Sequence, residues 1–407
     1  MLYAFLLGKN TALSLAEIFS VLAREHFIFV SFSISGNALI IKLDKRIENP
    51  QDFLDRLGGT VKIAEIITET PEKEVKGPIL GYISNSFSDS KFVFGISSYN
   101  TSFPRLGFEI KKELKDLVIN SRFVRGKEKE LSAPEIKNNK ILTHGADFVL
   151  IKNIDKIFVG KTIAIFDYES YSFRDWNRPR RNAKSGMLPP KLAQIMLNLI
   201  PTYNPLGAYR LPLIFDPFCG QGTILQEALL MGYQAIGSDN SKERIYDAKE
   251  NLKWLKKEYD LKIEVEKMVF QADALNLTEK NLPAKPDVIV SEVYLGPPLT
   301  GKESEKEIIQ LTENLQQKYI QFIQNTYYLL PTTYYFVLAL PFYKLKNKVY
   351  HLNIIDEIKS IGYNVIDPFD QTGIGFDLLP EYDKIRKTIL YSRPDQMVGR
   401  EIIILKK

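Results

Sequence analysis

Three aspartates in the carboxyl-terminal half of the chain each follow a short apolar run. Asp216 ends LIFD, Asp239 follows QAIGS, and Asp273 follows VFQA. Because the carboxyl ends of parallel strands meet at one edge of an open α/β sheet, we expect the three carboxylates to face one ligand. Carboxylates accept hydrogen bonds from ribose hydroxyls and from an adenine amino group, so the set favours an adenosine-containing ligand. Each aspartate alone could instead cap the helix that follows it.

The stretch from Leu213 to Thr223, LIFDPFCGQGT, leads the first of these aspartates into a glycine-containing turn. Gly220 and Gly222 allow a tight turn and let a ligand approach the main chain. A dinucleotide-binding motif would have its third glycine at the position of Leu225. The absence of that glycine argues against a ligand that contains a pyrophosphate. The pattern therefore predicts an adenosyl cofactor without a pyrophosphate, namely S-adenosylmethionine.

Cys219 is the only cysteine of the chain. An intrachain disulfide and a cysteine-rich zinc site are therefore excluded, and no metal site is predicted. Its place in the glycine turn favours a small buried filler over a nucleophile.

The length of 407 residues indicates more than one domain, and 45% hydrophobic with 25% charged residues is typical of a globular protein. No positively charged, apolar leader opens the chain, and no apolar window is long enough to span a bilayer. We expect a cytoplasmic protein without a membrane segment.

Basic residues concentrate in the amino-terminal half. Residues 1–200 contain 29 Lys and Arg against 22 Asp and Glu, whereas residues 201–407 contain 25 against 27. This asymmetry favours a polyanion-binding module beside a catalytic one, although it could also be chance. Arg122 and Arg125 flank Phe123 and could contact RNA, or could belong to a solvated strand edge.

Strands alternate with helices between residues 213 and 361, which predicts a doubly wound, Rossmann-like sheet with a closing antiparallel hairpin over residues 389–405. The order βαββαβ over residues 3–68 suits a ferredoxin-like α+β unit. We expect an amino-terminal domain at 1–70, a second α+β domain at 71–166, an aromatic, aperiodic linker at 167–184 and a catalytic domain at 185–407.

Several segments resemble the THUMP-domain tRNA guanine-N2 methyltransferases, which are class I S-adenosylmethionine-dependent enzymes. DPFCGQGT is similar to their motif I, and AKSGMLPPKLAQIMLNL resembles the cofactor-pocket segment before it. LLGKNTALSLAEI, LGGTVKIAEI, RDWNRPRRNAK and YSRPDQMVGREI also resemble this family. The resemblance implies that residues 71–166 form a THUMP domain that grips tRNA and that a guanosine of the position-10 type is methylated.

The motifs and the resemblance together give the candidate site. The candidate cofactor-binding residues are Met187, Leu188, Pro189, Asp216, Pro217, Phe218, Cys219, Gly220, Gly222, Thr223, Asp239, Asn240, Asp273 and Ala274. The candidate RNA-binding residues are Arg122, Arg125, Arg178, Arg180 and Arg181.

The methyl-acceptor motif departs from the family. Where the family has Asp-Pro-Pro-Tyr or a close variant, this chain reads SEVYLGPP from Ser291 to Pro298. Either Glu292 or Ser291 takes the aspartate position; in the second alignment Tyr294 keeps the aromatic one. Glu292 can accept hydrogens from a guanine amine, and Tyr294 can stack on an extruded base. Without the two prolines we expect a less rigid loop.

Two other functions fit the same patterns. One is a DNA amino-methyltransferase, which would not need residues 1–165. The other is an RNA-binding homologue that keeps the pocket without catalysis. The sequence predicts tRNA or another structured RNA as a partner and leaves open a small activator subunit, the oligomeric state, and mono- versus dimethylation.

Overall fold

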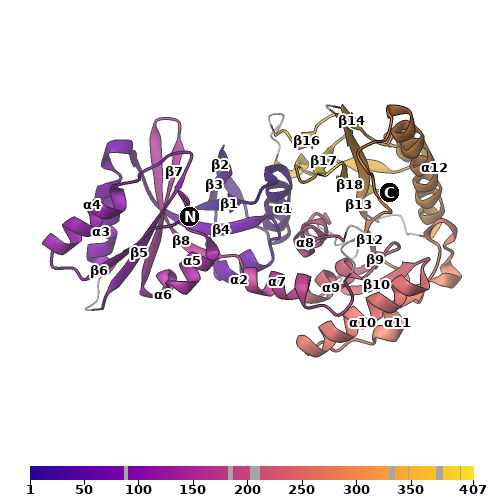
Figure 1. The fold of residues 1–407 in the computed structure, drawn as a ribbon, viewed down its shortest axis with the longest axis horizontal. Coiled ribbons are helices and arrows are strands. Elements are labelled where there is room, and N and C mark those ends of the chain that lie inside the picture. Colours follow the sequence, from indigo (N-terminus) through magenta and orange to yellow (C-terminus); the bar gives the residue numbers. More distant parts are fainter. Residues whose placement is uncertain are drawn as a thin grey trace. The chain divides into compact units, whose positions relative to one another are not determined.

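The computed structural model describes residues 1–86, 90–181, 187–201, 211–329, 335–346, 348–372, 379–394 and 396–407. The chain forms two compact units (Figure 1). The first comprises Met1–Thr11 and His26–Ser170, and the second comprises Ala12–Glu25 and Tyr171–Lys407. In the part of the chain that is described, no helix is long and apolar enough to cross a membrane.

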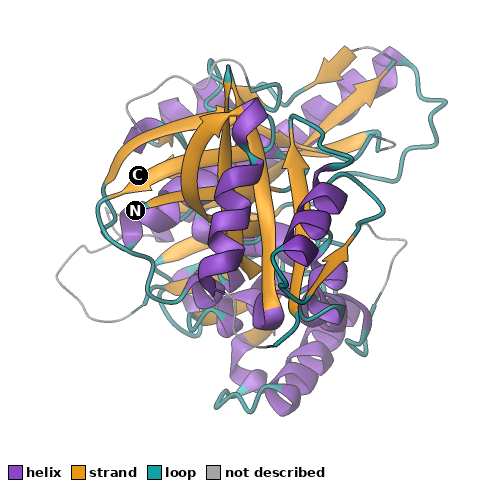
Figure 2. Ribbon diagram, turned by 90° about the vertical axis from the view of Figure 1, so that its left-hand side faces the viewer, coloured by secondary structure: helices purple, strands orange, loops and turns teal. Residues whose placement is uncertain are grey.

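The first unit is built on an eight-stranded sheet with the order β2-β3-β1-β4-β8-β7-β5-β6. Its strands are β1 (Leu2–Leu7), β2 (Phe29–Ser35), β3 (Ala38–Leu43), β4 (Thr60–Pro71), β5 (Phe92–Tyr99), β6 (Ser121–Val124), β7 (Gly145–Asn153) and β8 (Lys156–Ile165). Its helices are α2 (Pro50–Asp55), α3 (Lys76–Ser86), α4 (Leu106–Asp116), α5 (Ala133–Asn138) and α6 (Ile141–His144). Helices lie against the faces of the strands (Figure 2).

The first four strands have the β2-β3-β1-β4 order of a ferredoxin-like unit, as the element order predicts. The boundary expected after residue 70 does not separate two sheets, because the long strand β4 pairs with β1 on one side and with β8 on the other. The segment 71–78, at the start of the second expected domain, contains the start of α3. The two amino-terminal domains expected from the sequence therefore share one sheet.

The second unit is built on a ten-stranded sheet whose main order is β11-β10-β9-β12-β13-β18-β17-β16. Its strands are β9 (Leu213–Asp216), β10 (Gln234–Asp239), β11 (Val269–Gln271), β12 (Val288–Glu292), β13 (Tyr335–Leu345), β14 (Lys348–Tyr350), β15 (Asn364–Ile366), β16 (Tyr382–Asp383), β17 (Thr388–Tyr391) and β18 (Val398–Lys406). Its helices are α1 (Thr11–Arg24), α7 (Tyr168–Trp176), α8 (Pro190–Asn198), α9 (Thr223–Leu230), α10 (Lys242–Glu258), α11 (Val265–Met268), α12 (Glu305–Leu329) and α13 (Ile355–Ile361).

The strands β11, β10, β9, β12 and β13 are parallel, and β18 runs antiparallel to β13. The chain order reverses at β9, which lies between β10 and β12, and ligands of open α/β sheets bind at such a point. The closing hairpin predicted at residues 389–405 corresponds to β17 and β18. The Rossmann-like sheet is thus confirmed.

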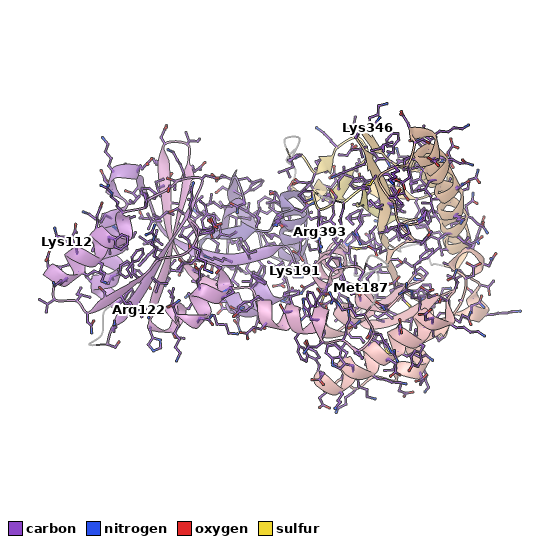
Figure 3. All side chains as sticks on the ribbon, viewed as in Figure 1. Lys112, Arg122, Met187, Lys191, Lys346 and Arg393 are labelled. Carbon is purple, nitrogen blue, oxygen red and sulfur yellow. The ribbon has the colours of Figure 1, made fainter. Side chains whose placement is uncertain are left out.

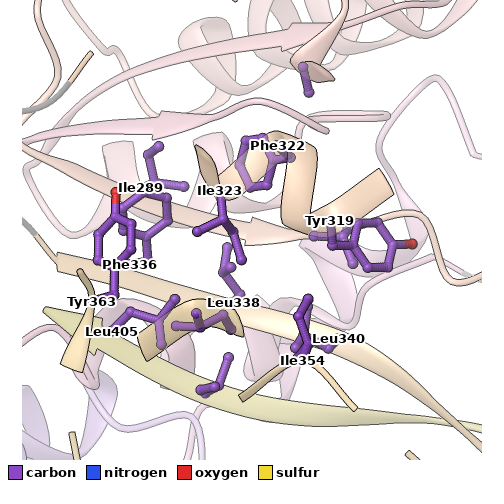
Figure 4. Close-up of a cluster of buried hydrophobic side chains, with 14 of the residues drawn as sticks. Ile289, Tyr319, Phe322, Ile323, Phe336, Leu338, Leu340, Ile354, Tyr363 and Leu405 are labelled. Carbon is purple, nitrogen blue, oxygen red and sulfur yellow. The ribbon is translucent and has the colours of Figure 1, made fainter. Parts of the chain in front are cut away.

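The long helix α12 covers one face of this sheet. Its apolar stripe includes Tyr319, Phe322 and Ile323, which pack with Ile289, Phe336 and Leu338 from the strands (Figure 4). Tyr363 and Leu405 close the same cluster, and all these side chains are almost fully buried. Burying large apolar side chains removes their surface from water and stabilises this face by about 1.5–3 kcal/mol for each.

One local expectation was wrong. The connector 167–184 begins with a regular helix, α7, because Tyr171 and Arg174 are buried on one side of it. The linker residue Lys184 and the hairpin residue Asp395 lie outside the described residues.

Candidate active site

A cavity of about 550 Å³ opens at the carboxyl ends of β9, β10 and β12. The candidate cofactor-binding residues on its wall are Met187, Leu188, Asp216, Pro217, Phe218, Cys219, Gly220, Thr223, Asp239, Asn240, Asp273 and Ala274. Pro189 and Gly222 are not on the wall; Pro189 caps α8 and Gly222 caps α9. The structure therefore brings most of the predicted set together around one space.

The glycine turn has the geometry that its residues predict. Gly220 and Gly222 have φ values of +50° and +79°, a region that residues with a side chain rarely adopt. The amide of Gly220 donates to the carboxylate of Asp239 at 3.1 Å, which connects the turn to the end of β10. The turn after β9 thus presents bare backbone to the cavity.

The three aspartates share one local arrangement. Asp216, Asp239 and Asp273 each accept a hydrogen bond from the backbone amide two residues further on, at 3.1, 2.9 and 3.0 Å respectively. These Asx turns fix the carboxylates at the ends of their strands. All three also line the cavity, so the turn-forming role and the ligand-facing position expected of them occur together.

Asp216 differs from the other two in its burial, at 2% exposed. Burial raises the pKa of Asp216 to about 8, against the hydrogen bonds that it accepts from Ser291 and Phe218. Ser291 Oγ donates to it at 2.6 Å. Ser291 is fully buried and does not line the cavity, so this candidate catalytic residue reaches the site only through Asp216.

Glu292 is the last residue of β12 and lies on the cavity wall. Its carboxylate accepts a hydrogen bond from Nε of Arg400, a buried residue of β18. Burial raises the pKa of Glu292, although the Arg400 guanidinium favours the charged form. Of the two alignments of the acceptor motif, the structure supports the one with Glu292 as the carboxylate that faces the cavity.

Two tyrosine hydroxyls hold the loop after Glu292. Tyr319 Oη donates to the carbonyl of Tyr294, and Tyr343 Oη donates to the carbonyl of Leu295 at 2.8 Å. Burial raises the pKa of both tyrosines, so both hydroxyls keep the hydrogens that they donate. These two hydrogen bonds anchor the backbone where the family has prolines, and the expectation of a less rigid loop stays a prediction. Tyr294 itself is 54% exposed and lines the cavity.

One candidate RNA-binding residue is in the wrong place for that role. Arg178 is 3% exposed, and its Nη1 donates to Thr223 Oγ1 at 2.8 Å. A buried guanidinium cannot reach a phosphate on the surface of RNA. The sequence could not show that Arg178 is buried while its neighbouring arginines are exposed, because the segment has no apolar periodicity.

The other four arginines are exposed. Arg181 stacks over Trp176 at 3.8 Å from the ring centroid, and Arg180 Nη2 donates to Tyr246 Oη at 3.1 Å, both in the second unit. Arg122 and Arg125 belong to the first unit, where Arg122 donates to Asn139 at 2.8 Å. Their side chains are accessible to a large ligand.

The first unit carries a basic groove of about 590 Å³ beside Arg122. It lies between α4 and β6 and is lined by Lys111, Lys112 and Lys115 together with apolar residues such as Phe108. Figure 3 labels Lys112 and Arg122 in the first unit. A groove with three ammonium groups suits a polyanion.

Further residues on the cavity wall were not predicted. They are Gln221, Ile224, Ser241, Arg244, Leu275, Val293, Leu295, Gly296, Lys318 and Tyr319. Gln221 and Ile224 belong to the glycine turn and its helix, so the motif itself could have indicated them. Tyr319 and Arg400 come from elements far along the chain and carry no local signal. Among the described residues, no three His, Cys, Asp or Glu side chains gather as a metal site would require.

Comparison with known proteins agrees with this geometry. Residues 178–327 match the family UPF0020, described as RMKL-like, methyltransferase domain. A tRNA (guanine(10)-N2)-dimethyltransferase of Methanothermobacter thermautotrophicus is 31% identical over 156 residues, which are 37% of this chain and 41% of that protein. The chain thus matches about two fifths of the length of this relative.

The structure of TrmN from Thermus thermophilus has a TM-score of 0.54 to this one, with 14% identity over the whole of both chains. At that identity the likeness concerns the fold. Residues 178–327 are thus similar to a methyltransferase domain, in agreement with the expected class of enzyme.

Proposed function

We propose that this chain, whose residues 178–327 form a methyltransferase domain of the RMKL-like family, methylates the exocyclic N2 amine of a guanosine in tRNA. The observation that carries the proposal is the position of Glu292, a carboxylate at the end of β12 on the wall of the cavity that also holds the three aspartates. The similarity to a tRNA (guanine(10)-N2)-dimethyltransferase supports tRNA as the substrate.

The hydrogen-bonding groups on the cavity wall fit S-adenosylmethionine. Asp239 and Asp273 offer acceptors for ribose hydroxyls and the adenine amine, and the glycine turn leaves space for a ligand near the main chain. Asp239, Asp273 and Glu292 make the wall acidic, which favours a cationic ligand. S-adenosylmethionine, when bound, supplies a methyl group on a positively charged sulfur.

The chain's own residues then have to activate a poor nucleophile. The lone pair of guanine N2 is delocalised into the ring, so the amine must be oriented and its hydrogens accepted. Glu292 is the acceptor that we propose, with Arg400 fixing its orientation. The carbonyls of Tyr294 and Leu295 are occupied by Tyr319 and Tyr343, which hold the loop while Tyr294 offers a ring for the base.

The exposed arginines and the basic groove of the first unit support RNA as the ligand. Phosphate contacts from Lys and Arg position a nucleic acid without reading its sequence. We propose that Lys111, Lys112, Lys115 and Arg122 take this part, and Arg125, Arg180 and Arg181 with them. The THUMP domain, an activator subunit and a cytoplasmic location stay predictions from the sequence.

The test is methyl transfer to an unmodified tRNA transcript, followed by mass spectrometry of the nucleosides. We expect N2-methylguanosine with the wild-type protein. Glu292→Gln, which keeps the shape of the side chain, should lower the rate by about a hundredfold or more, because general-base and electrostatic contributions are of that size.

Glu313→Gln is the matched control, since Glu313 is an exposed glutamate of α12 outside the cavity. Its rate should equal that of the wild type. No methylated guanosine in any tRNA, or a wild-type rate for Glu292→Gln in a protein with an unchanged melting temperature, would contradict the proposal.

A further inference from the structure

The second unit has another groove, of about 560 Å³, at the far end of the loop that follows Glu292. This acceptor loop comprises residues 293–303, and the groove lies between its last residues, the end of β13 and residues 394–397. We call it the β13 groove. Its wall carries Lys302, Lys344 and Lys346, the last of which Figure 3 labels in the second unit. Three ammonium groups thus gather on one wall.

The acceptor loop connects the β13 groove to the cavity. Leu295 and Gly296 line the cavity, whereas Gly301 lines the groove. The chain from Gly296 to Gly301 can span at most about 18 Å, even when it is fully extended. Strand β13 makes a second connection, because Tyr343 Oη donates to the carbonyl of Leu295 and the next residue, Lys344, lines the groove. The cavity and the groove are therefore neighbouring sites of one unit.

The three lysines keep hydrogen-bond donors for a ligand. Lys302 and Lys346 are exposed, and their ammonium groups form no hydrogen bond or ion pair within the described part of the chain. Lys344 is half-buried, and its Nζ donates to the neutral hydroxyl of Ser392 at 2.6 Å. Since an ammonium group has three hydrogens, Lys344 can still donate to a second partner.

The carboxylates near these lysines have other partners. Glu303 is the one acidic side chain that the described residues place on the groove wall. Its carboxylate accepts hydrogen bonds from the amides of Thr300 and Gly301 at 2.6 and 2.9 Å, and the hydrogen bonds of this turn lower the pKa of Glu303 to about 2. Glu305, the next carboxylate along the chain, is paired with Lys348 at 3.0 Å. The described residues of the groove therefore leave it with a net positive charge.

This charge differs from that of the surrounding sequence and of the cavity. Residues 201–407 contain 25 Lys and Arg against 27 Asp and Glu, and the cavity wall is acidic. A nucleotide whose base enters the cavity carries a phosphate on each side, and an acidic wall repels phosphates. The strand that carries this nucleotide therefore needs a basic surface close to the acceptor loop.

We infer that the β13 groove binds phosphates of the RNA strand next to the nucleotide that is methylated. The inference rests on the proposed function, since it takes Glu292 as the place of the target base. Lys302 and Lys346 bind phosphate oxygens with their exposed ammonium groups, and Lys344 adds a third charge. Such contacts fix the register of a nucleic acid without reading its sequence. The lysines are thus positioning residues for the target strand.

The first test removes two of the charges in a double variant of the full chain, Lys302→Gln with Lys346→Asn. Asparagine suits position 346, because the φ of +55° there lies in the left-handed region, which asparagine tolerates better than lysine. Binding of an unmodified tRNA transcript is measured by fluorescence anisotropy at several salt concentrations. The slope of log Kd against log salt should fall by about two, since each lost phosphate contact lowers it by about one. Binding of S-adenosylhomocysteine should be unchanged, because both lysines lie outside the cavity.

The matched control is Lys257→Gln with Lys280→Gln. Both lysines are exposed in the second unit and lie outside the cavity and the β13 groove. This variant loses the same charge, so its salt slope should equal that of the wild type. An unchanged slope in the Lys302 and Lys346 variant, or an equal fall in the control, overturns the inference.

The second test locates the phosphates. Neutral methylphosphonate linkages replace the two phosphates on each side of the guanosine that the wild type methylates. Wild type and control should bind this tRNA about tenfold more weakly than the unaltered one, whereas the Lys302 and Lys346 variant should lose less than about threefold. An equal loss in all three proteins overturns the inference. If the wild type binds tRNA but transfers no methyl group to it, the proposed function fails, and the salt slope alone still decides whether the groove binds RNA.

Discussion

Burial distinguishes the carboxylates that line the cavity. Asp216, at 2% exposed, keeps its proton to about pH 8, because the cost of burying the charge exceeds the effect of the donors from Ser291 and Phe218. Glu292 is partly buried and also has a raised pKa, but it has a guanidinium partner in Arg400. Two acidic residues of one site thus have different electrostatic surroundings, and only the second has a counter-ion to stabilise its ionised form.

Asp216 gives a prediction about pH. Its pKa is raised from 3.8 to about 8 on folding, so between these values the native protein holds a proton that the unfolded chain has released. The stability that this proton contributes is present at low pH and is lost as the pH rises towards 8. Asp216→Asn removes this titratable group. Between about pH 5 and pH 8, the melting temperature of the wild type should therefore fall relative to that of the variant.

The measurement is thermal unfolding of the ligand-free protein from pH 5 to pH 9. Asp247→Asn serves as a control, since Asp247 lies outside the cavity. If wild type and Asp216→Asn follow parallel curves over this range, the protonated state assigned to Asp216 is wrong.

The residues that could be predicted were those whose role follows from local spacing. The three aspartates and the glycine turn follow strands that can be recognised from their apolar runs. The prediction that they lie at one edge of the sheet was therefore possible from the sequence. Arg178 could not be separated from Arg180 and Arg181, because burial of one arginine among several depends on packing against α9. Arg400 could not be paired with Glu292 either, since the pairing exists only through the neighbouring strands β12, β13 and β18.

The acceptor loop is held from two elements that are remote in the chain. Tyr319 comes from α12 and Tyr343 from β13, and their hydroxyls bind successive carbonyls of the loop. Gly296 follows with a φ of +89°, and a Cβ there would lie 2.5 Å from Tyr343 Oη. The loop therefore passes directly over the tyrosine that holds it.

Removal of one hydroxyl should loosen the loop without disturbing the cofactor end of the cavity. For Tyr343→Phe we expect kcat for tRNA methylation to fall by about tenfold, because misplacement of reacting groups is costly, while the Kd for S-adenosylhomocysteine changes by less than about threefold. The control is Tyr328→Phe, since Tyr328 is an exposed tyrosine of α12. Equal kcat values for the two variants would show that the hydrogen bond to Leu295 has no part in catalysis.

At the scale of elements, most helices and strands followed from apolar periodicity and the misses have physical causes. Helix α7 was missed because aromatic and charged residues alternate in it without a continuous apolar stripe. Helix α11 has four residues, which are too few to show a period. The closing hairpin was found because its apolar pattern extends over many residues.

At the scale of the whole molecule, each unit contributes a different property. The first unit contains the basic groove at α4, and the second contains the acidic cavity at the ends of β9, β10 and β12. The uneven charge of the sequence already indicated this division. It could not show that β4 joins the two expected amino-terminal domains into one sheet, because pairing between β4 and β8 depends on contacts across about a hundred residues.

The central claim is that the acceptor is the N2 amine of a guanosine in tRNA. The most direct measurement uses a tRNA in which the guanosine identified by mass spectrometry is replaced by inosine, which lacks only that amine. Methyl transfer from S-adenosylmethionine to this tRNA should be lost, while its Kd for the protein stays within about threefold of that of the unaltered tRNA. Continued transfer at the inosine would contradict the account, because the methyl group would then have gone to another atom.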